Sequence, residues 1–258
     1  MVNVVESGMA SSFGTVAPAY AELRPDYAAA AVRSALSGVS PGQVLDLGAG
    51  TGKLSAVLAA VGADVVAVEP DPAMLAELRR SLPAVEAVSG SAESIPLPDA
   101  SVTAVLAGHA LHWFDMAMAS PEIRRVLRPG GVLAGLWNVY DDQVDWVRGL
   151  ADVAGPAAVG PRDLLSSWRD ATAGLLLDLP GFAGREVGEH PHGQRHTAAS
   201  LTAALATRAG MLVMAEPERR TVLDRIRAYL AGRPETTSGE FTLPMRTGVL
   251  RTSLAVGG

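Results

Sequence analysis

The stretch that most constrains the fold is 44–54, Val-Leu-Asp-Leu-Gly-Ala-Gly-Thr-Gly-Lys-Leu, where an apolar run meets three alternating glycines and then a helical pattern. The run predicts a buried β-strand. The glycines predict a sharp turn, because glycine adopts left-handed backbone conformations and lets a ligand approach with no Cβ in the way. The N–H groups at the start of the following helix point at such a ligand. The stretch therefore predicts a strand–turn–helix unit that binds a small molecule.

Two phosphate-binding motifs are similar to this turn but differ from it in spacing. The dinucleotide motif is G-x-G-x-x-G, whereas Gly48, Gly50 and Gly52 form G-x-G-x-G. The P-loop has four residues between its first glycine and G-K-[ST], whereas three residues separate Gly48 from Gly52, and Leu54 stands where a hydroxyl is required. Neither phosphate motif fits.

The segment 46–52 instead resembles motif I of the class I S-adenosylmethionine (SAM)-dependent methyltransferases, and is most similar to the small-molecule branch that includes trans-aconitate-type methyltransferases. The resemblance implies a doubly wound, Rossmann-like α/β sheet of seven strands in the order 3-2-1-4-5-7-6. It also implies an N-terminal helical lid and a helical insertion after strand five. The methionine part of SAM would lie at the turn, against Asp46, Gly48, Ala49, Gly50 and Gly52. The resemblance covers nearly the whole chain, strongly over 43–138 and weakly beyond.

Composition excludes several classes of function. The net charge of the 258 residues is −6 and Lys53 is the only lysine, which argues against nucleic-acid binding because that requires clustered cations. The absence of cysteine excludes disulfides and thiolate metal sites. No apolar run is long enough to span a membrane, and no signal peptide is evident. We expect a cytoplasmic monomer or homodimer.

The first 40 residues are predicted to form the lid, and 41–258 the SAM-binding domain with an insertion at about 141–180. The segment from Phe13 to Tyr27 resembles the N-terminal lid of this family. By that resemblance Tyr20 and Arg24 would hold the methionine carboxylate, to which arginine can donate two parallel hydrogen bonds. The alternative is that Tyr20 packs on an apolar helix face and Arg24 is solvated.

A second predicted strand, 63–68, is nearly all apolar and is followed at once by Glu69. An acidic residue at the end of the second strand of a nucleotide-binding unit accepts hydrogen bonds from ribose hydroxyls. Pro70 and Met74 follow on the same side, and Met74 either packs on the adenine or belongs to the core. We expect Glu69 to hold the ribose.

The segment 90–99 follows a third predicted strand at 85–88 and resembles the family's G-[DS]-A-E-x-[IL]-P sequence. By resemblance Ser91, Ala92 and Glu93 would contact the adenine edge. Many relatives carry aspartate at the position of Ser91, which weakens the side-chain contact here. A plain turn is the alternative, because the prolines of this segment favour one.

The fourth predicted strand, 101–106, leads into a segment similar to the family's A-x-x-x-H-W-F sequence. Gly108 is predicted to contact the cofactor there, with His109 and His112 beside it at the carboxyl ends of the strands, where ligands bind in such sheets. A histidine of near-neutral pKa can accept a proton from the methyl acceptor. Packing and orientation are the alternative, because an activated methyl donor does not always need a base.

The remaining polar candidates lie farther along the chain. Strand five is predicted at 132–138, after a helix at 121–127; strand six at 182–189; helices at 197–210 and 217–230; and a last strand at 240–254. Substrate contacts are predicted at Trp113, Asn138, Tyr140 and His192. Three histidines between 190 and 196 suggest a metal site, but Glu189 is the only carboxylate beside them, so no metal is predicted.

The predicted function is transfer of a methyl group from SAM to a small molecule, such as a secondary metabolite, with release of S-adenosylhomocysteine (SAH). Two alternatives stay open at this point. The chain could bind SAM and catalyse a non-methylating reaction such as a cyclisation, or it could be a SAM-binding module without turnover. A tRNA substrate is disfavoured by the acidic charge balance.

Overall fold

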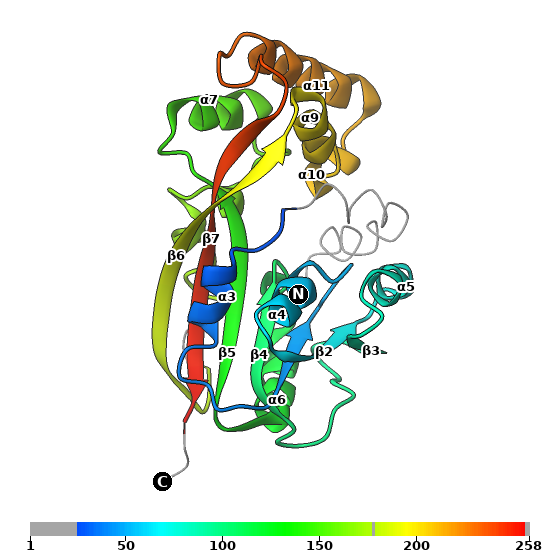
Figure 1. Cartoon of the computed structure of the whole chain (residues 1–258), viewed down its shortest axis with the longest axis vertical. Helices are drawn as coiled ribbons and strands as arrows, with labels where there is room; N and C mark the ends of the chain where they lie inside the picture. The colour runs from blue at the N-terminus through cyan, green and yellow to red at the C-terminus, as the bar shows by residue number, and fades with distance from the viewer. Residues whose placement is uncertain (1–24, 177–178, 256–258) are drawn as a thin grey trace.

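The computed structural model describes residues 25–176 and 179–255, and a seven-stranded sheet runs through it. The strand order is β3-β2-β1-β4-β5-β7-β6, which confirms the predicted fold class (Figure 1). Strands β1 to β5 are parallel, and β7 is antiparallel to both of its neighbours. The strands are β1 Gln43–Leu47, β2 Asp64–Glu69, β3 Glu86–Ser89, β4 Val102–Gly108, β5 Leu127–Tyr140, β6 Phe182–His196 and β7 Phe241–Leu254.

Helices cover both faces of the sheet, as near-continuous apolar strands require. On one face lie α3 (Ala29–Ala35), α4 (Lys53–Ala60) and α5 (Pro72–Ser81). On the other lie α6 (Met116–Val126) and α8 (Trp168–Thr172). Alternate residues of β1 enter different cores, Val44 the first and Leu45 the second. The sheet is therefore doubly wound.

A group of helices that we call the cap stands at the carboxyl ends of the parallel strands. The cap consists of α7 (Asp145–Ala154), α9 (Ala198–Ala206), α10 (Ala209–Leu212) and α11 (Glu216–Ala231), at the top of Figure 1. Its apolar core includes Tyr140 at the end of β5 and Met245 near the start of β7. The longer strands β5, β6 and β7 thus carry the cap above the edge where β1 and β4 end.

Several elements differ from their predicted bounds: β5 spans 127–140 instead of 132–138, and the predicted helix at 197–210 is divided into α9 and α10. Strand β6 and helix α6 differ as well. Strand β6 does not stop at residue 189 but continues to His196, because residues 190–196 pair one by one with 241–247 of β7. Helix α6 begins at Met116 instead of residue 121, with Pro121 inside it. The Asp115 side chain caps that helix by accepting a hydrogen bond from the Ala117 N–H at 3.1 Å. Pairing with β7 extends β6 past Pro191 and Gly193, and the cap at Asp115 starts α6 before Pro121. These prolines and the glycine had suggested that the elements end or begin there.

The predicted division into a lid (1–40), a SAM-binding domain (41–258) and an insertion (141–180) stays a prediction. Tyr20 and Arg24 lie outside the described residues. Helices α7 and α8 fall in 141–180, but the cap also draws on residues 198–231. No helix within the described ranges is long and apolar enough to cross a membrane.

Candidate active site

The glycine turn after β1 has the backbone geometry that its sequence predicts. Gly48, Gly50 and Gly52 all have positive φ, at 71°, 58° and 89°. A Cβ at Gly48 would lie 2.8 Å from the Cβ of Ala110, closer than real Cβ contacts. The turn packs on β2 through the Gly48 N–H, which donates to the Val68 carbonyl at 2.9 Å. Any residue other than glycine at position 48 would be both strained and crowded.

The Glu69 carboxylate joins this turn to the start of α5. Its Oε2 accepts a hydrogen bond from the Gly50 N–H at 2.8 Å, and its Oε1 accepts one from the Asp71 N–H at 2.9 Å. Burial raises the pKa of Glu69 above its ordinary value, and these two N–H donors oppose that rise. Each carboxylate oxygen is held by one backbone donor and keeps a lone pair for a second.

A cavity of about 890 Å³, which we call the Glu69 cavity, lies beside this carboxylate. It brings together most residues predicted to hold the ribose and adenine, and it also contains Trp113, which was predicted to touch the substrate. Asp71, Ala110 and Phe114 line it as well and were not singled out from the sequence. The lining residues are Gly48, Glu69, Pro70, Asp71, Met74, Ser91, Ala92, Glu93, Ala110, Trp113 and Phe114.

A second cavity, the Asp46 cavity, is lined by other residues of the glycine turn and by the start of α4. It contains four residues predicted to lie at the cofactor, Asp46, Ala49, Gly50 and Gly108, and one predicted substrate contact, Asn138. His109 also lines it. The lining residues are Pro25, Tyr27, Asp46, Ala49, Gly50, Thr51, Lys53, Leu54, Gly108, His109, Asn138 and Arg208.

Two buried oxygens in the Asp46 cavity have no hydrogen-bond partner within the described part of the chain, namely Asp46 Oδ1 and Thr51 Oγ1. The other carboxylate oxygen of Asp46 accepts a hydrogen bond from the Ser55 hydroxyl at 2.6 Å. Burial raises the pKa of Asp46 from 3.8 to about 7, against the opposing effect of Ser55. A buried polar oxygen without a partner is costly, so this pair favours a donor from a ligand.

His109 holds the end of β4 against β5. Its backbone is left-handed, with φ of 51°. Its N–H donates to the Leu136 carbonyl at 2.8 Å, and its ring Nε2 accepts from the Asn138 N–H at 2.8 Å. The lone pair of Nε2 is therefore occupied by a backbone donor, and proton transfer at this atom would require that hydrogen bond to break.

Asn138 fixes the segment that precedes α3. Its Nδ2 donates to the carbonyls of Pro25 and Asp26 at 3.1 and 3.2 Å, while its Oδ1 accepts from the Thr247 hydroxyl at 2.7 Å. The Thr247 hydroxyl oxygen in turn accepts from the Ala28 N–H at 3.0 Å. Asn138 thus lines the Asp46 cavity with its side chain already engaged by the protein.

The cap reaches the Asp46 cavity through Arg208, a residue that no sequence motif indicated. The guanidinium forms an ion pair with Asp163 at 3.1 Å and donates to the Tyr140 hydroxyl at 3.1 Å. Tyr140 therefore lies behind Arg208 and not on the cavity wall. These contacts show how residues from β5, from 161–163 and from the cap meet at one point.

Besides Tyr140, three of the predicted site residues that the structure describes line neither cavity. Gly52 lies behind the turn, where a Cβ would meet Leu82 and Leu78. His112 is buried against Trp113 with ring centroids 4.8 Å apart, and burial lowers its pKa to about 3. His192 lies on β6, and burial lowers its pKa too. The residues that the structure describes contain no group of three or more His, Asp or Glu side chains placed to hold a metal ion.

Tyr27 also lines the Asp46 cavity, although it was not among the predicted site residues. It is almost fully buried, and a Cβ at Gly108 would lie 2.5 Å from its hydroxyl oxygen. Gly108 is therefore required so that the Tyr27 ring can lie over the end of β4. Tyr27 could have been predicted from the sequence, because it belongs to the segment that resembles the family's lid.

The fold and the site define a Rossmann-like α/β protein with two cavities at the carboxyl ends of its parallel strands. The family profile described as methyltransferase domain matches residues 45–135. An uncharacterized methyltransferase of Mycobacterium tuberculosis is 40% identical over 248 residues, 96% of this chain and 97% of that protein. This chain therefore belongs to the class I SAM-dependent methyltransferases.

Other similar proteins match a smaller part of the chain or have a lower sequence identity. A demethylmenaquinone methyltransferase of Chlorobaculum tepidum is 40% identical over 106 residues, 40% of this chain and 44% of that protein. A solved structure from Anaeromyxobacter dehalogenans, described as a type II methyltransferase, has a TM-score of 0.66 and 25% identity and covers 90% of this chain and 98% of that one. The [4+2]-cyclase SpnF, with a TM-score of 0.52 and 17% identity over 99% of this chain and 98% of its own, shares the fold alone. The narrower resemblance to trans-aconitate-type enzymes stays a prediction.

Proposed function

We propose that this chain transfers the methyl group of SAM to a small-molecule acceptor and releases SAH. The observation that carries the proposal is the pair of cavities that residues of the glycine turn line. One ends at Glu69, and the other at the buried oxygens of Asp46 and Thr51. SAM carries an adenosine, whose ribose has two hydroxyls, on one side of its sulfonium and an amino acid group with an ammonium and a carboxylate on the other, so its ribose and ammonium match these two ends.

The residues present fit such a ligand. Glu69 keeps lone pairs for the ribose hydroxyls, since each of its oxygens accepts one backbone N–H from the residues that the structure describes. Asp46 Oδ1 and Thr51 Oγ1 lack donors among the described residues, and an ammonium group supplies them. The turn between them carries no side chain at Gly48 or Gly50, which leaves the backbone open to close approach. Met74, Trp113 and Phe114 supply apolar walls for an adenine ring.

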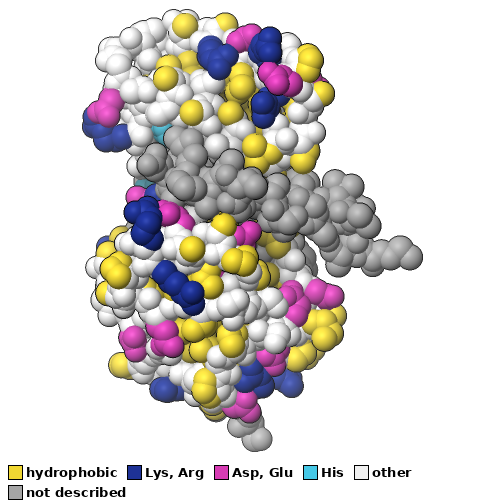
Figure 2. Space-filling model, turned by 90° about the vertical axis from the view of Figure 1, so that its right-hand side faces the viewer, with side chains coloured by type: hydrophobic (Ala, Val, Ile, Leu, Met, Phe, Trp, Pro, Cys, Tyr) yellow, Lys and Arg dark blue, Asp and Glu magenta, His cyan; other side chains and the backbone are white. Residues whose placement is uncertain are grey.

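The acceptor would enter on the cap side of the Asp46 cavity. Arg208 and His109 line that cavity from different elements. Asn138 lines it too, and Tyr140 supports Arg208 from behind. On the face shown in Figure 2, acidic and basic side chains are interspersed over the described residues. This distribution and the net charge of −6 favour a small acceptor over a nucleic acid.

In this proposal catalysis depends on how the protein positions the methyl donor and the acceptor. SAM, when bound, supplies a methyl group already activated on a sulfonium. The protein's task is to align the acceptor and to exclude water, which can lower the barrier by several kcal/mol. His109 contributes by fixing the end of β4, since its Nε2 is engaged by the Asn138 N–H. Neutral His112 supports Trp113 from behind. Proton acceptance by either histidine stays a hypothesis.

Incubation with SAM that carries a trideuterated methyl group, in the presence of fractionated small metabolites, tests the proposal. A product heavier by one labelled methyl group, together with SAH, is expected. Turnover of a metabolite without gain of the label would instead indicate a non-methylating reaction. SAH binding without any turnover across all fractions would indicate a binding module.

A further inference from the structure

The loop after β3, residues 90–99, supplies one wall of the Glu69 cavity and then runs along α6. Ser91 and Ser94 exchange two backbone hydrogen bonds, of 3.4 and 3.3 Å. A Cβ at Gly90 would lie 2.5 Å from Cδ of Pro96, so the two ends of this tight turn are in contact. Because these contacts join the two halves of the loop, residues 91–93 should move when residues 95–97 move.

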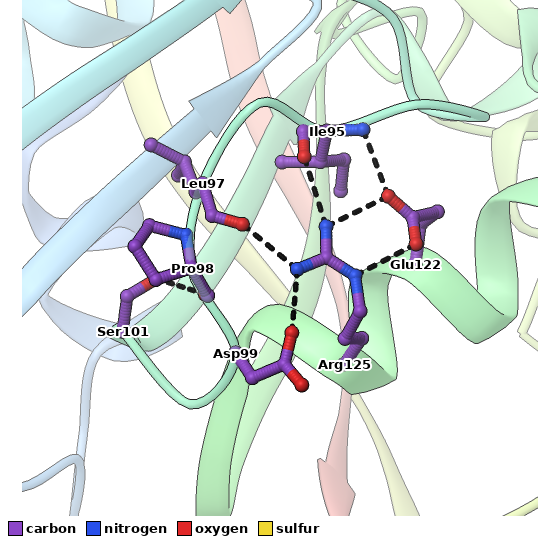
Figure 3. Close-up of polar contacts among 7 residues, drawn as sticks. All are labelled: Ile95, Leu97, Pro98, Asp99, Ser101, Glu122 and Arg125. Carbon is purple, nitrogen blue, oxygen red and sulfur yellow. Dashed lines mark hydrogen bonds and ion pairs between the residues drawn. The ribbon is translucent and has the colours of Figure 1, made fainter.

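Two side chains of α6 hold the far half of this loop (Figure 3). Arg125 Nη2 donates to the Ile95 carbonyl at 2.9 Å, and its Nη1 donates to the Leu97 carbonyl at 2.8 Å and to Asp99 Oδ1 at 2.8 Å. Glu122 Oε2 accepts from the Ile95 N–H at 3.0 Å. Both backbone polar groups of Ile95 are thus held by one helix.

Arg125 and Glu122 also hold each other. Arg125 Nε and Nη2 each donate to one oxygen of Glu122, at 2.8 Å. These hydrogen bonds lower the pKa of Glu122 to about 2, so the pair stays ionised at neutral pH. The planar fork of arginine satisfies two carbonyls and two carboxylates at once. Lysine has a single donor group on a flexible stem and cannot reproduce this geometry.

The other end of α6 is tied to the same cavity. The N–H of Asp115, the residue that caps the helix, donates to Glu93 Oε1 at 3.0 Å. Trp113 and Phe114, which come just before it, line the same cavity as Ser91. Helix α6 therefore joins the two walls between which the proposed function places the adenine ring.

We infer that Arg125 and Glu122 are positioning residues for the cofactor: they hold the 90–99 loop in the shape in which residues 91–93 complete the adenine pocket. This inference rests on the proposed function. Without the pair the loop opens in the folded protein, and only the fraction with a closed loop binds the ligand. The apparent Kd then rises by the inverse of that fraction.

The test uses the full chain and SAH as the probe. Arg125→Met removes the donors but keeps an unbranched side chain of similar length. Arg124→Met is the matched control, because Arg124 lies exposed on the same helix. For each variant, calorimetry gives the Kd for SAH, and amide hydrogen exchange without ligand compares residues 91–97 with the buried strands β1 and β4.

The inference predicts that Arg125→Met raises the Kd by about 10-fold and accelerates exchange in 91–97, with exchange in β1 and β4 unchanged. The Kd ratio should equal the ratio calculated from the open fraction of the loop. Arg124→Met should change neither quantity. Arg125→Lys should fall between, and it serves in place of Arg125→Met if that variant does not fold. Glu122→Gln should weaken binding in the same direction, and less than additively when combined with Arg125→Met.

A merely structural role gives a different result. Loss of global stability would accelerate exchange in the loop and the strands alike and leave the Kd of the folded protein unchanged, and this pattern would overturn the inference. An unchanged Kd with an unchanged loop would overturn it too. If the wild-type chain does not bind SAH, the proposed function itself fails, and the exchange data still show whether Arg125 holds the loop.

Discussion

The buried carboxylate of Asp46 gives the sharpest prediction for stability. Its pKa rises from 3.8 to about 7 in the folded protein because the side chain has no solvent exposure. Between these values the folded state retains a proton that the unfolded chain has lost, so unfolding releases a proton and stability falls as the pH rises. The difference corresponds to about 4 kcal/mol at about 1.4 kcal/mol per pH unit.

Asp46→Asn removes this titration and keeps the shape of the side chain. The amide oxygen can still accept the hydrogen bond from the Ser55 hydroxyl. Urea denaturation of both proteins from about pH 4 to about pH 8 should show the variant gaining stability over the wild type as the pH rises, by up to about 4 kcal/mol. The gain should start above pH 4 and level off above pH 7. A difference that stays constant over the whole range would refute the account of Asp46.

The same carboxylate should couple binding to pH. If Asp46 Oδ1 accepts a hydrogen bond from the ammonium of SAH, the bound ligand favours the ionised form. The affinity of the wild-type chain for SAH should then increase as the pH rises through about 7. In Asp46→Asn the affinity should be lower and should not increase over that range. Parallel pH profiles for the two proteins would place the ammonium elsewhere.

Three further substitutions test other parts of the site. Glu69→Gln places an amide NH₂ against one of two backbone donors and should weaken SAH by about 1–3 kcal/mol; equal calorimetric affinity would remove Glu69 from the ribose site. Gly48→Ala combines a positive φ with a contact to the Ala110 Cβ and should cost about 1–3 kcal/mol of unfolding free energy; an unchanged urea midpoint would contradict this geometry. Asn138→Ala removes the hydrogen bonds to the Pro25 and Asp26 carbonyls and to the buried Thr247 hydroxyl and should make the chain more sensitive to limited proteolysis before α3; wild-type digestion rates would count against that role.

The sequence predicts the glycine turn and the end of β2 because they depend on local signals, whereas the strand order was predicted from the resemblance to a known family. Alternating glycines demand left-handed backbone, and Gly48, Gly50 and Gly52 all have it. An apolar strand that ends in a lone carboxylate predicts Glu69 at the strand end, and the structure places it there. These signals need only neighbouring residues, so periodicity and turn chemistry suffice.

The parts of the site that the sequence did not indicate depend on long-range contacts. Arg208 lies in the chain far from the glycine turn and reaches the Asp46 cavity only because β5 and β7 carry the cap there. The engagement of the His109 ring by the Asn138 N–H depends on the pairing of β4 with β5. In the sequence Arg125 resembles any surface arginine, and its role depends on hydrogen bonds to the carbonyls of Ile95 and Leu97 in the loop of residues 90–99. No local pattern carries such information.

Calorimetric titration of the purified wild-type chain with SAM and with SAH tests the central claim most directly. The account predicts that both ligands bind with micromolar affinity and one-to-one stoichiometry, since both carry the ribose and the ammonium group that the two cavities would hold. A folded sample that binds neither ligand would contradict it, and would mean that the glycine turn and Glu69 serve a different ligand.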